Sequence, residues 1–271
     1  GSKIADRKWT TIGVEKNLNH LLRYENRDNF IEEVAEMRDK PPYFKNMEKM
    51  NLENNADKDF PLIKSLSAGE FEKLSKKDNT IVVDTREYNS FASAHIPDSL
   101  FIWKERLAKF AGWFIDSNKN ILLVSDNDYP QKEIETLYRM GLDNIVGYLS
   151  GSLLAWHNSG KTSDTIGTIN VEETCNIIDR GEDLILLDVR AKGEIKESAK
   201  ITDAVNIVLT DLVDEYTKLS KDKEIYIFCG SGVRAMTASS ILKRRAFDKL
   251  NVVLGGINAW SSISCPLKNF D

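Results

Sequence analysis

Cysteine and histidine are scarce in this chain, with three of each among 271 residues. An odd and sparse set of cysteines argues against a disulfide scaffold and for a reducing compartment, so we expect a cytoplasmic protein. The cysteine spacings fit no zinc motif, and no two histidines are close in sequence. We therefore expect no metal site and no bound cofactor.

Long apolar runs and an excess of positive charge are also missing. No apolar run approaches the roughly 18 residues that a membrane helix needs, and no signal peptide is visible. The formal net charge is −5, and the short basic cluster 243–245 is typical of a helix C-terminus, where cations are favourable. We therefore expect neither a membrane nor a nucleic acid as partner. The length, with 41% hydrophobic and 29% charged residues, is typical of about two soluble domains.

A repeat with a spacing of 104 residues organises most of the chain. Three pairs of segments share this spacing, namely 80–86 with 184–190 (both apolar runs ending in Asp-x-Arg), 121–125 with 225–229, and Ala155-Trp156 with Ala259-Trp260. The offset aligns Ser125 with Cys229. Three pairs at one constant spacing indicate two copies of a domain of roughly 105 residues.

Within each copy, short apolar strands alternate with helical stretches, which is typical of an α/β domain with a mainly parallel sheet. We predict one helix over 233–245, with its apolar residues on one side, and another from beyond Pro130 to about Met140. The first 55 residues lie outside the repeat. Their patterns predict helices over 14–23 and 28–37 and a shorter one ending near Met50, which is too little chain to bury an independent core.

The segment that carries the clearest chemistry is the run Cys229-Gly-Ser-Gly-Val-Arg234. Cys229 ends a predicted strand, where α/β sheets place their sites. The small residues Gly230, Ser231 and Gly232 let the backbone N–H groups turn inward as an anion-binding nest. Val233 opens a helix whose N-terminus adds partial positive charge, and Arg234 supplies a permanent cation. Each feature favours the thiolate, which is the nucleophilic form of cysteine.

Other residues of chemical interest have plainer explanations. Cys175 lies in a helical pattern with apolar neighbours and Cys265 lies in the C-terminal tail, so we interpret both as structural, since unpaired cysteines are often buried. The Asp and Arg of each Asp-x-Arg sequence are expected to hold the domain together through hydrogen bonds near the end of the sheet. Trp156 and Trp260 are expected in the core.

Taken together, these motifs resemble rhodanese domains, the sulfurtransferase fold. In the second copy the resemblance rests on three sequences, Asp188-Val-Arg190, Cys229 to Arg234, and Leu254-Gly-Gly-Ile-Asn-Ala-Trp260. In the first copy it rests on Asp84-Thr-Arg86, His95-Ile-Pro97 and residues 151–156. The fold class expected from the resemblance is α/β, with two tandem rhodanese-like domains whose parallel sheets are flanked by helices, plus a short helical N-terminal segment.

The resemblance implies a persulfide on Cys229, a small-molecule sulfur donor such as thiosulfate or a low-molecular-weight persulfide, and a thiol or cyanide as acceptor. Rhodaneses use a six-residue loop and their phosphatase relatives a seven-residue loop. Cys229 to Arg234 is six residues, which favours sulfur over a phosphatase- or arsenate-reductase-like activity. The residues implied to bind the substrate are Gly230, Ser231, Gly232, Val233 and Arg234.

Both copies depart from the family pattern. The first has Ser125 at the cysteine position, followed by Asp126 and Asp128. A hydroxyl forms no persulfide, the carboxylates would repel an anion, and no base is evident beside Ser125, so we interpret this copy as catalytically inactive. The second lacks the His-x-Pro-Gly-Ala element of many rhodaneses and has no basic residue directly after Cys229.

The N-terminal segment resembles the C-terminal end of a metallo-β-lactamase-fold domain, as in persulfide dioxygenase-like proteins fused to rhodanese domains. The resemblance rests on residues 11–17, 41–44 and 47–51. It implies that a metal-dependent domain of the same polypeptide is missing here and is a partner of Cys229. We therefore predict three segments: 1–56 as a helical remnant of that domain, 57–160 as an inactive rhodanese-like domain, and 165–271 as an active one. A competing hypothesis is a non-catalytic binding or regulatory module with Cys229 as a redox sensor.

Overall fold

The computed structural model describes residues 7, 9–34, 40–52, 60–197 and 200–263. The chain separates into two compact units, Gly1–Lys40 and Pro41–Asp271. In the part of the chain that is described, no helix has the length and apolar character to span a membrane. Cys265 lies outside the described residues.

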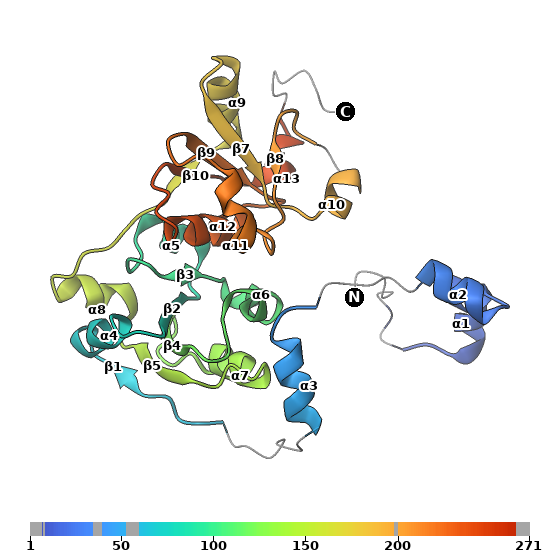
Figure 1. The fold of residues 1–271 in the computed structure, drawn as a ribbon, viewed down its shortest axis with the longest axis horizontal. Helices are drawn as coiled ribbons and strands as arrows, with labels where there is room; N and C mark the ends of the chain where they lie inside the picture. Colours follow the sequence, from blue (N-terminus) through green and yellow to red (C-terminus); the bar gives the residue numbers. More distant parts are fainter. Residues whose placement is uncertain (1–6, 8, 35–39, 53–59, 198–199, 264–271) are drawn as a thin grey trace. The chain divides into compact units, whose positions relative to one another are not determined.

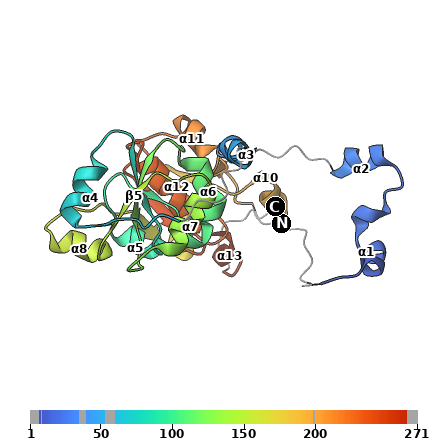
Figure 2. The same ribbon diagram turned by 90° about the horizontal axis from the view of Figure 1, so that it is seen from below.

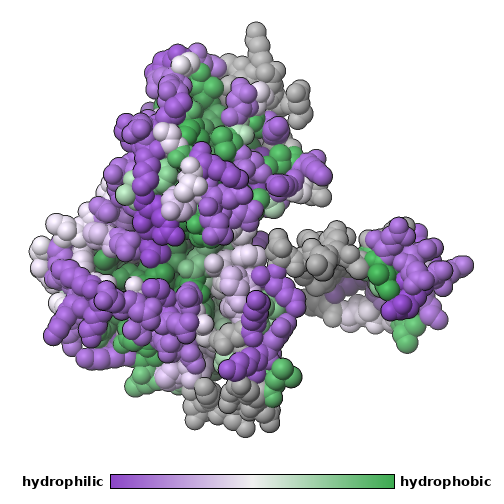
Figure 3. Space-filling model, in the orientation of Figure 1, coloured by the Kyte–Doolittle hydropathy of each residue, from purple (hydrophilic) through white to green (hydrophobic). Residues whose placement is uncertain are grey.

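The first unit is small and helical. It contains α1 (Ile12–Leu18), the 3-10 helix η1 (His20–Arg23) and α2 (Arg27–Val34). Neither α1 nor η1 buries a residue, and Trp9 and Ile12 are about four-fifths exposed, at 80% and 77%. Figure 3 shows hydrophobic side chains of this unit at the surface beside hydrophilic ones. The segment is thus too short to bury a core of its own, as predicted, and Asn19 divides the first predicted helix in two.

The second unit begins with α3 (Phe44–Leu52) and then forms two five-stranded sheets (Figure 1). The strand orders are β1-β5-β4-β2-β3 and β6-β10-β9-β7-β8, and all the strand pairs are parallel. The strand that precedes Ser125 and the strand that precedes Cys229 take the same place in the two orders. The predicted class, α/β with two parallel sheets flanked by helices and a short helical N-terminal segment, is confirmed.

The elements of the first domain are, in order, β1 (Ser65–Leu66), α4 (Ala68–Ser75), β2 (Thr80–Asp84), α5 (Tyr88–Ser93), β3 (Leu100–Phe101), η2 (Lys104–Arg106), α6 (Leu107–Phe114), β4 (Asn120–Val124), α7 (Gln131–Arg139), β5 (Ile145–Leu149) and α8 (Ser152–Asn158). Those of the second are β6 (Gly167–Ile169), α9 (Val171–Asp179), β7 (Leu184–Asp188), α10 (Lys192–Glu197), β8 (Val205–Asn206), α11 (Leu212–Glu215), η3 (Tyr216–Lys218), β9 (Glu224–Phe228), α12 (Val233–Lys243), β10 (Leu250–Val253) and α13 (Gly256–Trp260).

The strands are continuous apolar runs because helices cover both faces of each sheet. In β2, Val82 packs with α4 and α8 on one face, while Ile81 and Val83 pack with α5, α6 and α7 on the other. Figures 1 and 2 show α4 and α8 together on one side of the first sheet and α6 and α7 on the other. In the second sheet, α9 and α13 cover one face, and α11 and α12 cover the other.

A buried ion pair closes the carboxyl end of the second strand of each domain. Arg86 Nε and Nη2 donate to the Asp84 carboxylate, with a closest distance of 2.7 Å. Burial raises the pKa of the Asp84 carboxyl, although the Arg86 charge acts in the opposite direction. Arg190 and Asp188 make the same contacts. The predicted structural role of these Asp-x-Arg sequences as hydrogen-bonded pairs is therefore confirmed, as is the burial of Trp156 and Trp260.

Helix α12 is buried on all sides. Eight consecutive residues, from Ala235 to Leu242, are buried, so the prediction that its apolar residues lie on one side only is wrong. One side packs on the second sheet and another contacts β3 and α5 of the first domain. A helix covered all round must be apolar or small in every direction, and this one alternates alanine, serine and branched residues.

Ser240 makes a specific contact between the two domains. The backbone N–H of Phe101, on edge strand β3, donates to Ser240 Oγ at 3.0 Å, and that hydroxyl donates in turn to Thr237 O within α12. An exposed strand edge offers unpaired backbone groups, and here α12 satisfies one of them. The neighbouring Ser239 bonds only to Met236 of its own helix among the contacts of the described residues.

Replacing Ser240 with alanine should therefore destabilise the protein by about 1–3 kcal/mol, because the buried N–H of Phe101 loses its acceptor. The matched change Ser239→Ala should cost less than about 1 kcal/mol, because it removes only a bond within the helix. The free energy of unfolding from urea titrations measures both. Equal losses for the two variants would contradict a role for Ser240 in joining the domains.

Candidate active site

The loop Cys229–Arg234 connects β9 to α12, as the sequence predicts, and α13 holds it in place. Ile257 N donates to Cys229 O at 2.9 Å, and Asn258 N donates to Gly230 O at 3.0 Å. This close approach depends on Gly256, because a Cβ built there would lie 2.2 Å from the Cys229 carbonyl oxygen. Gly232 takes a φ of +102°, a left-handed conformation that glycine adopts readily.

The sulfur of Cys229 lies under this loop. The Gly232 N–H donates to Cys229 Sγ at 3.2 Å, which is the inward-turned backbone donor that the small residues predict. The Cys229 side chain is 1% exposed and is a free thiol. Cys175, by contrast, is buried in α9, which confirms its interpretation as structural, but it is disulfide-bonded, so the expectation that it is unpaired is wrong.

Arg234 is partly buried and interacts with the sulfur of Cys229. Its Nη1 and Nη2 donate to the two carboxylate oxygens of Glu194, on α10, at 2.6 and 2.7 Å. Burial lowers the pKa of Arg234, but the Glu194 hydrogen bond and the interaction with the Cys229 charge more than offset it, so the pKa lies above its ordinary value. The same hydrogen bond has the opposite effect on its acceptor and lowers the pKa of Glu194. Glu194 was not predicted from the sequence as the partner of Arg234.

A cavity of about 260 Å³ opens beside Arg234, and both domains line it. The second domain contributes Glu194, Ser231, Val233 and Arg234, and the first contributes Trp103, Arg106, Lys109 and Phe110 from η2, α6 and the residue before them. No sequence motif marks the first-domain residues. The signal that could have found them is Lys109, the one charged residue of an otherwise apolar α6, with Arg106 directly before that helix.

The charges around this cavity are mostly positive. Arg106, Lys109 and Arg234 face one carboxylate, Glu194. Arg106 and Lys109 are exposed while Arg234 is partly buried, so an anion entering the cavity would meet a fixed guanidinium and two solvated cations. An excess of positive charge at a cavity raises the local concentration of anions.

The predicted loop residues therefore come together, but with different surroundings. Cys229 and Gly232 are buried, Gly230, Val233 and Arg234 are partly buried, and Ser231 is exposed. The described residues include no group of three or more His, Cys, Asp or Glu side chains that could hold a metal ion.

The corresponding loop of the first domain has Ser125 in place of the cysteine and makes a different contact. Ser125 Oγ donates to the carboxylate of Glu133 at 2.9 Å, and the Asn127 side chain donates to the same oxygen at 3.2 Å. The prediction that Ser125 has no basic partner is therefore wrong. Position 130 is proline where the second domain has Arg234, so the guanidinium has no counterpart there.

A family model described as "Rhodanese-like domain" matches this chain twice, at residues 67–159 and 170–263. "Putative sulfurtransferase YtwF" of Bacillus subtilis (strain 168) is 37% identical over 89 residues, which are 33% of this chain and 84% of that protein. A "Sulfurtransferase" of Allochromatium vinosum is 29% identical over 86 residues, 32% of this chain and 79% of that protein. Among solved structures, a rhodanese-like domain protein from Staphylococcus aureus has a TM-score of 0.33 and 27% identity, over 35% of this chain and 91% of that one.

The contact between α13 and the Cys229 loop gives a sharp prediction for Gly256→Ala. Gly256 and Gly181 both have positive φ, at +51° and +70°, but a Cβ at Gly181 would meet nothing within 4 Å. Gly181→Ala should cost about 1–2 kcal/mol for the left-handed backbone alone. Gly256→Ala should cost about 1–3 kcal/mol more, because the loop must also shift. Chemical denaturation measures the difference, and no excess loss for Gly256→Ala would contradict the close contact.

Proposed function

The chain belongs to the family of rhodanese-like domains, and from that premise we propose that it is a sulfurtransferase that carries sulfane sulfur as a persulfide on Cys229. The observation that carries the proposal is the buried thiol with the Gly232 N–H on its sulfur and Arg234 beside it. A thiolate and a terminal persulfide are both anions, so the same donor and the same cation stabilise both.

The proposed reaction has two steps. The Cys229 thiolate attacks the outer sulfur of thiosulfate, the S–S bond of thiosulfate breaks, and sulfite leaves with the electron pair. Cyanide or an acceptor thiolate then attacks the terminal sulfur of the persulfide. The product is thiocyanate or an acceptor persulfide, and the Cys229 thiolate is regenerated. A low-molecular-weight persulfide donates in the same way, with its thiolate as the leaving group.

An anionic donor fits the cavity better than a neutral one. The loop has no basic residue directly after Cys229, but Arg106 and Lys109 of the first domain face the same cavity. We expect Arg234 to exchange its partner Glu194 for the incoming anion, because both contacts use the same guanidinium nitrogens. The first domain thus takes part in binding the donor, although it has no nucleophilic thiol of its own at Ser125.

A non-catalytic module with Cys229 as a redox sensor stays the competing hypothesis, because the burial of Cys229 limits the access of an oxidant and of thiosulfate alike. The likeness of residues 1–56 to the end of a metallo-β-lactamase-fold domain stays a prediction, and so does an exchange of sulfur with a metal-dependent domain. The predicted segment boundaries at 56, 160 and 165 also stay predictions, although the elements of the two sheets fall within them.

Incubation with thiosulfate should add the mass of one sulfur atom to the protein on Cys229, and cyanide should remove it. Cys229→Ser should gain nothing, because a hydroxyl forms no persulfide. In the double variant Cys229→Ser/Ser125→Cys, the new thiol should also stay unmodified, because the carboxylates of Asp126 and Glu133 lie at that loop. Intact-protein mass spectrometry measures the added mass on the wild type and on both variants. An unmodified wild type, with both thiosulfate and glutathione persulfide, would falsify the proposal.

Removing the first-domain cations should weaken the use of thiosulfate. Arg106→Met and Lys109→Met should each lower kcat/KM about two- to fivefold, the size expected for exposed charges near an anion, and salt should reduce the difference. Arg139→Met is the matched control, since Arg139 is an exposed first-domain arginine paired with Glu135 and does not line the cavity. An unchanged kcat/KM in the double variant Arg106→Met/Lys109→Met would show that these first-domain cations play no part in binding the donor.

A further inference from the structure

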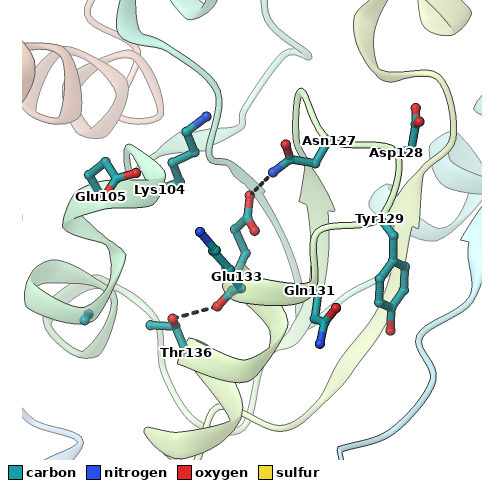
Figure 4. Close-up of a pocket in the computed structure, with 10 residues that line it drawn as sticks. Lys104, Glu105, Asn127, Asp128, Tyr129, Gln131, Glu133 and Thr136 are labelled. Carbon is teal, nitrogen blue, oxygen red and sulfur yellow. Dashed lines mark hydrogen bonds between the residues drawn. The ribbon is translucent and has the colours of Figure 1, made fainter.

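The first domain has a cavity of its own at the loop that corresponds to the Cys229 loop. This cavity has a volume of about 700 Å³ and lies between the loop around Asn127 and Tyr129, the segment η2–α6, and the first turns of α7 (Figure 4). Its volume is typical of a small-molecule site. The sulfur-transfer proposal gives it no role, since Ser125 carries no sulfur.

Glu133 is the central feature of this cavity. It lines the cavity, yet its side chain is only 2% exposed. Its Oε1 accepts the hydrogen bonds from Ser125 and Asn127. Figure 4 shows the Asn127 amide pointing toward this carboxylate. In the described part of the chain, Oε2 has no hydrogen-bond partner and Glu133 forms no ion pair. A buried carboxylate that is met only by neutral donors retains a strong preference for a cation.

The fold itself does not require an acid at this position. The offset of 104 residues places Thr237 of the second domain at the position of Glu133. Thr237 is equally buried, at 2% exposure, in the equivalent helix. An acid in the first turn of α7 gains a little from the helix N-terminus, but α12 forms without one. The carboxylate is therefore a feature of this cavity rather than of the domain.

The remaining charges of the cavity extend the same preference. Asp128 and Glu105 line it together with Glu133, against two cations, Lys104 and Lys132. The net charge of these lining residues is negative, whereas that of the residues lining the cavity beside Arg234 is positive. The two loops thus occupy equivalent places on their sheets and present opposite charge.

We propose that the first-domain cavity binds a small molecule through a primary ammonium group, which donates to Oε2 of Glu133. Asp128 and Glu105 add attraction at the rim. Lys104 and Lys132 let the ligand carry a carboxylate as well, so that amino-acid-like zwitterions are accepted and plain anions are not. This binding does not depend on Cys229 or on its sulfur chemistry.

A titration of ¹⁵N-labelled protein with n-butylammonium, 4-aminobutyrate and butyrate tests the proposal by backbone amide NMR. The first two should give saturable shifts centred on residues 125–136, and butyrate should give none there. Shifts confined to other parts of the chain, no saturation with either amine, or equal shifts with butyrate would each overturn the proposal.

Three variants separate Glu133 from the general charge of the cavity. Glu133→Gln keeps the shape and both neutral contacts but should weaken ammonium binding about tenfold or more, because a charge-assisted hydrogen bond is lost. Glu105→Gln makes the same charge change at an exposed position and should alter affinity about twofold at most. Ser125→Ala keeps the carboxylate and should retain binding, and the dispersion of the amide spectrum of Glu133→Gln itself shows whether that variant is folded. Equal weakening by Glu133→Gln and Glu105→Gln would show that Glu133 is not the binding group.

Discussion

The packing of α12 between two domains is the interaction on which the rest of this structure depends. The helix belongs to the second domain and follows the Cys229 loop directly, yet it also covers edge strand β3 of the first domain. Because it is buried in every direction, it cannot move without opening both cores. The position of the Cys229 loop relative to the first domain follows from this packing, and so does the place where Arg106 and Lys109 meet Arg234.

Two glycines, which have no side chain, allow a second set of contacts that fixes the Cys229 loop. Gly256 allows α13 to donate two backbone N–H groups to the carbonyls of Cys229 and Gly230, and Gly232 turns its own N–H onto the sulfur. The loop carbonyls are thus bonded outward while a backbone donor points inward. That division of donors and acceptors is what makes a short peptide segment suited to hold an anion.

The two domains show how one scaffold supports different sites. The strands, the helices and the buried Asp–Arg pairs correspond, but the segments that follow β4 and β9 differ in charge. Pro130 and Glu133, at the start of α7, stand where α12 has Arg234 and Thr237. The segment η2–α6 lies between these two environments. Lys104 and Glu105 line the first-domain cavity, while Arg106 and Lys109 line the cavity beside Arg234. A single short segment therefore lines both sites.

From the sequence we could predict the two copies, their α/β class, the position of the Cys229 loop between a strand and a helix, and the hydrogen-bonded role of the Asp-x-Arg pairs. These features depend on local patterns, namely apolar runs, glycine positions and a constant spacing, which can be read without knowing what lies nearby. Only the folded structure shows the partner of Arg234, the Ser125–Glu133 contact, the burial of α12 on all sides, the disulfide bonding of Cys175, and the first-domain residues that line the cavity beside Arg234. Each of these is a contact that depends on how helices pack rather than on where they begin and end. Glu194 is 40 residues from Arg234, and Lys109 lies in the other domain, so no local pattern could have paired them.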